Sequence, residues 1–326
     1  MNGITRRGFG LRAFAALSAP ATLLAGAPAR AAAYPERDIT MVVNFGAGGV
    51  TDLMSRALAR SMEGTLGRTV VVTNRPGALG TLGPAFVAKQ KPDGYTLGTV
   101  SASATTITPH LMDVAFKPSD LQFIAGYGIN RYGLVVRADS PLKTVDDLVK
   151  AAKGSKSMLF GSPSMPNSLI LFLLGKMTGG RFELVQYKSG PEAAAALIGS
   201  QVDVIVPNPP DVMSHIKSGR LRLLASASSA RWPEFPDVPT LKETGYNVAY
   251  DAWVGLAAPA GTPADVVARL QSAVQAAIRD PQSRQAYANV GAEAAFMPGA
   301  EYTDFLARER AQMKQLIQDV GVQKVN

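Results

Sequence analysis

Ten short apolar runs alternate with helix-like segments along this chain, and this alternation constrains the fold more than any other feature. The runs cover residues 39–43, 70–73, 95–100, 121–127, 133–137, 158–160, 182–187, 202–206, 221–227 and 253–258. Between many of them, apolar residues recur at the spacing of one helix face, as they do at Met54, Leu58 and Met62. Strands that alternate with helices predict an α/β fold whose parallel sheets are covered on both faces.

Two interruptions of the alternation divide the chain. The first is the turn at 137–141, and the second lies near 250–253, after the proline-rich loop 231–239. If the chain crosses from one lobe to the other at the first interruption and returns at the second, the protein has two lobes and the C-terminal third completes the first. The predicted boundaries are 34–136 plus 252–326 for lobe 1, and 137–251 for lobe 2. We expect the final helical pattern, from Glu301 to about Asp319, to pack on lobe 1.

The amino terminus has the pattern of an export signal. An arginine pair at 6–7 precedes an apolar stretch at 14–27, and small residues follow up to Ala33. The arginine pair indicates the Tat route. A membrane anchor is the alternative, and it is disfavoured because the stretch is too short to span about 30 Å of hydrocarbon. We predict a Tat-type signal peptide over 1–33, cleavage after Ala31 or Ala33, and a periplasmic mature protein.

The charge balance favours a small anionic partner. The chain carries 33 basic and 25 acidic residues; without the four arginines of the predicted signal, 29 basic and 25 acidic residues remain, a net charge of +4. No cluster of basic residues interleaved with aromatics indicates nucleic-acid binding. The absence of cysteine excludes disulfides and thiolate metal sites, and two histidines cannot form a histidine-rich metal cluster. We therefore expect no metal, no cofactor and no nucleic-acid partner.

A glycine-rich turn at 44–52 is the most specific candidate for binding. It lies between the apolar run 39–43 and a helical pattern that begins near Thr51. A turn of this kind leaves backbone N–H groups unpaired at a helix start, where the helix dipole adds partial positive charge. The turn is therefore predicted to hold an anion.

Nucleotide binding and catalysis are both disfavoured. The turn has Thr51 where a dinucleotide-binding loop has its third glycine, and Asn74 stands where an acid binds the ribose. The second glycine-rich segment, 77–83, lacks the lysine of a P-loop. No G-x-S-x-G nucleophile motif occurs. His110, in a loop, and His215, on a short helical pattern, are interpreted as structural, so we expect no catalytic residue and no enzyme activity.

The whole mature chain resembles the extracytoplasmic solute receptors of tripartite tricarboxylate transporters, the Bug receptors. The motifs that carry the resemblance, in chain order, are Phe45-Gly46-Ala47-Gly48-Gly49-Val50-Thr51-Asp52, Asn74-Arg75-Pro76-Gly77-Ala78, Lys91-Pro92-Asp93-Gly94-Tyr95-Thr96-Leu97, Tyr187-Lys188-Ser189-Gly190, Gly219-Arg220-Leu221-Arg222, Pro236-Asp237-Val238-Pro239-Thr240 and Trp253-Val254-Gly255-Leu256-Ala257-Ala258-Pro259-Ala260-Gly261-Thr262-Pro263. Each motif alone is weakly specific, but their order and spacing together are specific.

The resemblance implies a periplasmic binding protein fold: two α/β lobes, a ligand cleft between them and two crossover strands. The lobes would close on a small carboxylate and deliver it to the membrane permease subunits of a transporter, with the receptor as a monomer. The ligand-binding residues implied in lobe 1 are Phe45, Gly46, Gly48, Gly49, Thr51, Asp52, Ser101 and Ser103. Those implied in lobe 2 are Ser162, Ser164, Asn167, Ser168, Tyr187 and Asn208.

Two of these residues have simpler explanations. Asp52 favours the helix dipole and would repel an anion, so we interpret it as a residue that holds the loop. Thr51 is also explained as a plain N-cap.

The chain departs from the family pattern where ligand identity is decided. Asn44 and Ala47 stand where prolines are usual, and the loop 162–168 lacks the usual glycines and final histidine. Pro207 replaces a common acid, which argues against a ligand with an ammonium group because an unpaired buried cation is costly. We expect a non-amino mono- or dicarboxylate, aliphatic or aromatic. An orphan sensor for a signalling partner and an exported α/β enzyme are the alternatives.

Overall fold

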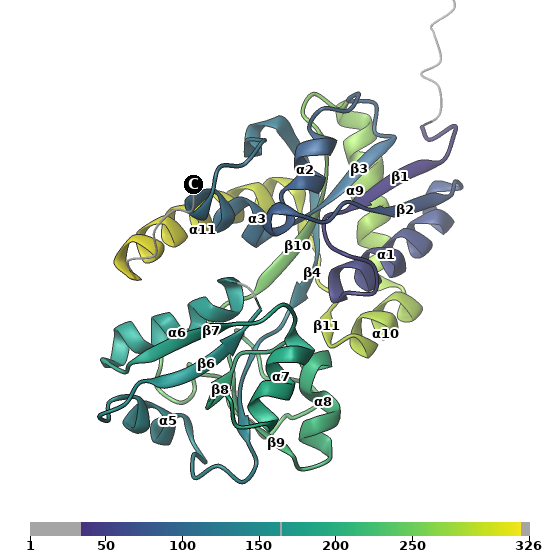
Figure 1. Ribbon diagram of the computed structural model, residues 1–326. Coiled ribbons are helices and arrows are strands. Elements are labelled where there is room, and N and C mark those ends of the chain that lie inside the picture. Colours follow the sequence, from purple (N-terminus) through teal and green to yellow (C-terminus); the bar gives the residue numbers. More distant parts are fainter. Residues whose placement is uncertain (1–33, 164, 321–326) are drawn as a thin grey trace, which may run out of the picture. The chain divides into compact units, whose positions relative to one another are not determined.

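The computed structural model describes residues 34–163 and 165–320, so the predicted signal peptide and Ser164 lie outside the described residues. The first of two sheets has seven strands in the order β11-β4-β10-β3-β1-β2, with β12 paired to β4 (Figure 1). Its strands are β1 (Ile39–Val43), β2 (Val70–Asn74), β3 (Thr96–Ser101), β4 (Leu121–Asn130), β10 (Ala252–Pro259), β11 (Ala292–Glu293) and β12 (Met297–Pro298). β1 is parallel to β2 and β3, whereas β10 is antiparallel to β3 and β4.

The second sheet has five strands in the order β7-β6-β8-β5-β9. They are β5 (Gly133–Arg137), β6 (Met158–Ser162), β7 (Phe182–Gln186), β8 (Val204–Ile205) and β9 (Leu221–Ser226). β6 is parallel to β7 and β8, and β5 is antiparallel to β8 and β9.

Every apolar run predicted from the sequence contains a strand, but the expectation of purely parallel sheets is wrong. Only Arg131 and Tyr132 separate β4 from β5, so the chain passes directly from one sheet into the other. A parallel neighbour requires a crossover of a dozen or more residues, usually through a helix. The strands that connect the sheets, β4, β5 and β10, pair antiparallel with their neighbours.

Helices cover both faces of the first sheet. They are α1 (Val50–Leu66), α2 (Leu82–Val87), α3 (Ala102–Thr106), α4 (Thr108–Leu111), α9 (Ala264–Arg279) and α10 (Pro281–Asn289). On one face, Met54 and Leu58 of α1 and Leu270 of α9 share a buried cluster with Met41 of β1. On the other face, Val87 of α2 packs in a separate cluster. None of the described helices is long and apolar enough to cross a membrane.

The second sheet is covered in the same way. Its helices are α5 (Val145–Ala152), α6 (Met165–Thr178), α7 (Gly190–Ile198) and α8 (Pro209–Lys217). Leu148 of α5 and Ile170 of α6 share one buried cluster, and Leu197 of α7 and Val212 of α8 share another. Each sheet is thus a separate α/β layer with its own apolar core.

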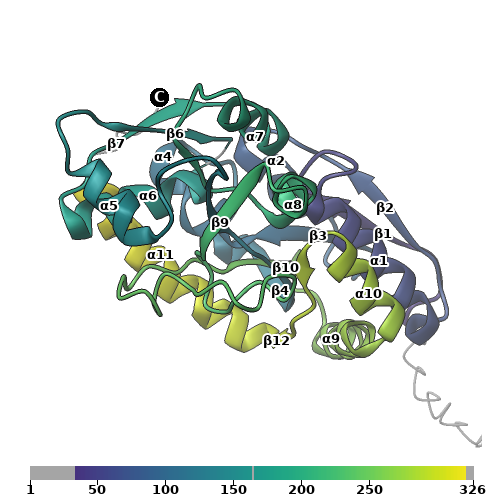
Figure 2. The same ribbon diagram turned by 90° about the horizontal axis from the view of Figure 1, so that it is seen from below.

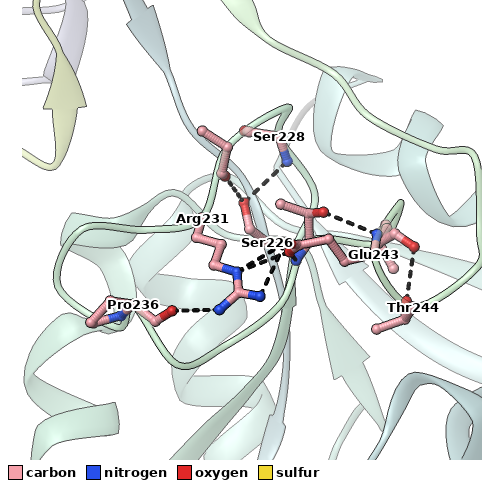
Figure 3. A network of polar contacts seen from close by, with 9 residues as sticks. Ser226, Ser228, Arg231, Pro236, Glu243 and Thr244 are labelled. Carbon is pink, nitrogen blue, oxygen red and sulfur yellow. Dashed lines mark hydrogen bonds and ion pairs between the residues drawn. The ribbon is translucent and has the colours of Figure 1, made fainter.

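The irregular segment between β9 and β10 is held by a local polar network (Figure 3). Arg231 Nε lies 3.0 Å from Glu243 Oε2, and Arg231 Nη1 donates to the carbonyl of Pro236 at 2.8 Å. Hydrogen bonds from Arg231, together with the Thr240 N–H, lower the pKa of Glu243 to about 2. Trp232 is fully buried beside this network. The segment therefore has a defined path that returns the chain to β10 and the first sheet.

The last helix, α11 (Gly299–Val320), packs on β4 of the first sheet and reaches α6 beside the second sheet (Figure 2). Tyr302 and Leu306 belong to a buried cluster of the first sheet, whereas Met313 and Ile317 belong to the cluster of α5 and α6. Lys176 of α6 and Asp319 form an ion pair. The expectation that this helix packs on lobe 1 holds for its first half only, because its apolar spacing continues past the edge of that sheet.

Candidate ligand-binding site

A cavity of about 570 Å³ lies between the two sheets. Its wall on the side of the first sheet is formed by Phe45, Gly46, Ala47, Gly49, Val50, Thr51, Leu79, Ser101, Ser103, Ile107 and Thr108. Asn130, Tyr132 and Ala252 line it where the chain crosses between the sheets. The opposite wall is formed by Pro163, Met165, Pro166, Asn167, Lys188, Ser189, Gly190, Asn208 and Asp211.

The glycine-rich turn after β1 lines this cavity and contains backbone N–H groups that have no hydrogen-bond acceptor among the described residues. Gly46, Ala47 and Gly49 line it, and in the described part of the chain their N–H groups donate no hydrogen bond. Val50 and Thr51 follow in the first turn of α1, where N–H groups have no partner within the helix. The turn thus has the donors and the helix dipole that an anion requires.

Asp52 holds this turn and does not line the cavity. Its side chain is 1% exposed, and it accepts hydrogen bonds from the Gly48 N–H at 2.9 Å, Arg56 Nε at 2.9 Å and Asn74 Nδ2 at 2.8 Å. Burial acts to raise its pKa, but these hydrogen bonds, led by that of Arg56, hold the pKa below its ordinary value. Its charge is therefore compensated by partners from the turn, α1 and β2.

Asn44 connects the turn to its neighbours. Its amide Nδ2 donates to the Gly80 carbonyl at 3.0 Å and to Ser101 Oγ at 3.3 Å, while its Oδ1 accepts from Thr99 Oγ1 at 2.8 Å. Ser101 Oγ also accepts from Ser103 Oγ at 3.2 Å. Because Ser101 already accepts two hydrogen bonds, its own O–H is left to donate at the cavity wall.

Leu79 extends the wall through an unusual backbone. Ala78 and Leu79 both have positive φ, 46° and 51°, a region that residues other than glycine rarely adopt. The Leu79 side chain is 52% exposed and lines the cavity. A Cβ on Gly80 would lie 2.9 Å from the Phe45 ring, so the loop packs closely on the anion turn. Strained residues of this kind concentrate at ligand clamps.

The start of α6 contributes a mainly apolar wall. Pro163, Met165 and Pro166 line the cavity there, with Asn167, whose Nδ2 donates to the Val206 carbonyl at 2.6 Å. Ser168 Oγ donates to Ser162 Oγ at 2.8 Å, and both serines are fully buried behind the wall. Neither Ser162 nor Ser168 therefore supplies polar surface to the cavity wall.

Asp211 is the acid of this wall. Its Oδ2 accepts the Asn208 N–H at 3.3 Å, and Asn208 Nδ2 donates to the Arg131 carbonyl at 2.8 Å. Burial raises the pKa of Asp211 to about 6, and the hydrogen bond from Asn208 acts in the opposite direction. Burial raises the pKa of the Tyr132 hydroxyl. The negative charge of Asp211 also raises this pKa, whereas a hydrogen bond with the Asn208 side chain lowers it.

Eight of the residues implied by the resemblance line the cavity: Phe45, Gly46, Gly49, Thr51, Ser101, Ser103, Asn167 and Asn208. The cavity wall does not include Gly48, Asp52, Ser162, Ser168 or Tyr187. Gly48 directs its N–H to Asp52, and the Tyr187 ring packs beside Gly161 of β6. Ser164 lies outside the described residues.

Sequence reasoning missed Leu79, Lys188 and Asp211. Lys188 lies within the motif 187–190 that carries the family resemblance, so its position in that motif could have indicated that it lines the site. Asp211 follows Asn208 by three residues, the spacing of a helix start. No cluster of three or more histidine, aspartate or glutamate side chains that could hold a metal occurs in 34–163 and 165–320.

Comparisons with known proteins agree with this geometry. The family model for tripartite tricarboxylate transporter family receptors matches residues 54–322. A UPF0065 protein from the gbd 5′ region of Cupriavidus necator is 35% identical over 325 residues, covering 98% of this chain and 99% of that protein.

Two solved structures are also similar over most of the chain. The periplasmic binding protein BugD is similar with a TM-score of 0.76 and 32% identity, over 90% of this chain and 100% of that one. An R. palustris protein solved with adipate is similar with a TM-score of 0.79 and 25% identity, over 90% of this chain and 100% of that one.

Proposed function

Because the chain belongs to the tripartite tricarboxylate transporter receptor family, we propose that it is a periplasmic receptor that captures a small carboxylate and delivers it to the permease subunits of such a transporter. The predicted signal peptide at 1–33 and the predicted monomeric state are parts of this proposal. In this proposal the residues that line the cavity bind the solute and catalyse no reaction.

The single observation that carries the proposal is the turn after β1. Its residues, with N–H groups that donate no hydrogen bond within the described residues, and Ser101 line the same cavity between two separately packed α/β layers. A carboxylate at this point would accept several hydrogen bonds and face the amino-terminal end of α1. Asp52 would not repel it, because Arg56 compensates that charge.

Ligand class is the finer part of the proposal. The similar R. palustris structure holds adipate, a dicarboxylate, which supports a small aliphatic acid as the type of solute. Pro207 argued against an ammonium group on the ligand, but Asp211 supplies an acid to this wall of the cavity. The proposal therefore extends to small carboxylates with or without an ammonium group.

A thermal-shift screen of carboxylates tests this function. A ligand at 100 times its Kd should add about 2.7 kcal/mol to the free energy of unfolding. Gly46→Leu should abolish the shift without unfolding the protein, because Gly46 lines the cavity and a Cβ there meets nothing within 4 Å. Gly64→Leu is the matched control, since Gly64 also has open space but lies outside the cavity wall.

Three outcomes of these experiments would count against the proposal. An unchanged ligand shift in Gly46→Leu would remove the turn from the site. Turnover of a bound carboxylate would favour an enzyme over a receptor. A dedicated sensor kinase that binds the loaded protein would replace the permease as its partner.

A further inference from the structure

The proposed function does not use the carboxylate of Asp211, and this inference deepens that function and rests on it. Asp211 lies at the start of α8 and lines the cavity on the side opposite the anion turn. A Cβ added to Gly190, the first residue of α7, would lie 2.0 Å from Asp211 Oδ2. The carboxylate is therefore fixed between two helix starts, and Gly190 is the residue that leaves room for it.

No basic side chain compensates the charge of Asp211 within the described residues. Its one hydrogen bond within the described residues comes from the Asn208 N–H at 3.3 Å, and it takes part in no ion pair there. Lys188 lines the same cavity but is exposed. Burial, with no basic group acting against it, raises the pKa of Asp211 to about 6. Asp52 is the contrast within this chain, because a guanidinium, an amide and a backbone N–H compensate it.

A carboxylate without a basic partner should favour ligands with an ammonium group over ligands with a second carboxylate. A second carboxylate on the ligand would face like charge at low dielectric, which costs binding energy. An ammonium group would instead supply the missing charge and up to three hydrogen-bond donors. The cavity wall contains one basic and one acidic residue, Lys188 and Asp211, among the residues described. A ligand of zero net charge matches this balance.

The cavity wall also has apolar members. Leu79, Ile107, Met165 and Pro166 are among them. These side chains suit methylene groups and offer no partners for further charges.

We propose that the ligand is an amino-carboxylate, bound with its carboxylate at the turn after β1 and its ammonium group on Asp211, and that Asp211 is the residue that rejects dicarboxylates. The acid in this proposal is Asp211, which lies four residues after Pro207, the position where an acid is common in the family.

Calorimetry with ligands paired for length tests the proposal. The pairs are 6-aminohexanoate with adipate and 4-aminobutanoate with succinate, and alanine and glutamate are added as α-amino acids. We expect the preferred amino-carboxylate to bind roughly tenfold or more tightly than the dicarboxylate of equal length. Asp211→Asn should reverse or abolish this preference, since it keeps the acceptor for the Asn208 N–H and loses the charge.

Two further variants keep the test independent of folding. Gly190→Ala keeps the charge but displaces the carboxylate, so it should reduce the preference for amino-carboxylates. Asp265→Asn, at an exposed acid of α9, is the control and should leave the preference unchanged. Equal or tighter binding of dicarboxylates by the unmodified protein, or an unchanged preference in Asp211→Asn, would overturn this inference alone. Binding of no carboxylate of any kind would overturn the proposed function and this inference with it.

Discussion

Replacing Glu309 by glutamine should stabilise this protein, and more so at high pH. Glu309 lies midway along α11 and is 7% exposed, and neither carboxylate oxygen has a hydrogen-bond partner within the described residues. Burial raises its pKa from the ordinary value of 4.5 to about 7. The hydroxyls of Tyr250 and Thr106 lie close enough to act in the opposite direction, but neither completes a hydrogen bond of ordinary geometry.

The magnitude follows from proton linkage. A carboxyl with a raised pKa binds its proton more tightly in the folded protein than in the unfolded chain. Its contribution to stability is therefore full below about pH 4.5 and is lost as the pH rises through about 7. A shift of this size corresponds to about 3 kcal/mol once both states are ionised. Glutamine has the same shape and no charge, so it avoids this loss.

Urea unfolding of the ligand-free protein measures the effect. The advantage of Glu309→Gln over the unmodified protein should be about 2 kcal/mol larger near pH 8 than near pH 5, because any change in packing enters equally at both. Asp304→Asn, at an exposed acid of the same helix, is the control and should show no such dependence. An advantage that is the same at both pH values would refute the account of Glu309 as a buried, uncompensated carboxylate.

Three further predictions concern the site. Asn44→Ala should lower the free energy of unfolding by about 1–3 kcal/mol in a denaturant titration, because it leaves the buried Gly80 carbonyl without its donor; an unchanged midpoint would contradict this. Leu79→Gly should keep or raise the melting temperature, since glycine tolerates φ of 51°, and should weaken ligand binding in calorimetry because an apolar contact is lost. Unchanged affinity would exclude Leu79 from the site. Adipate should bind more tightly as the pH falls through about 6, where Asp211 becomes protonated beside Lys188 and Tyr132, and this gain should be absent in Asp211→Asn.

The sequence predicted the strands well because each buried strand is an apolar run of its own. It did not predict their directions, because the antiparallel pairing of β4, β5 and β10 depends on where the chain crosses between the two sheets and not on the apolar pattern of any one strand. The short strands β11 and β12 pair two residues each at the edge beside β4, too few for a periodic pattern.

The site was predictable where it is local. The turn after β1 combines glycines, a strand end and a helix start within one stretch of chain. The opposite wall was not predictable, because Asp211 and Gly190 meet only through the packing of α7 against α8. Ser162 and Ser168 were favoured as polar residues near a helix start, yet their hydroxyls bond to each other.

Helix α11 packs on the first sheet at one end and on α6 of the second layer at the other, where Lys176 and Asp319 pair. We expect a helix held in this way to keep the two layers at a set spacing on its side when the cavity opens. We therefore expect the opening motion to rotate about an axis near α11, with solute entering from the far side. A partner of the proposed receptor would then meet a surface near α11 that stays the same in the loaded and empty states, and a second surface, around the entrance, that differs between them.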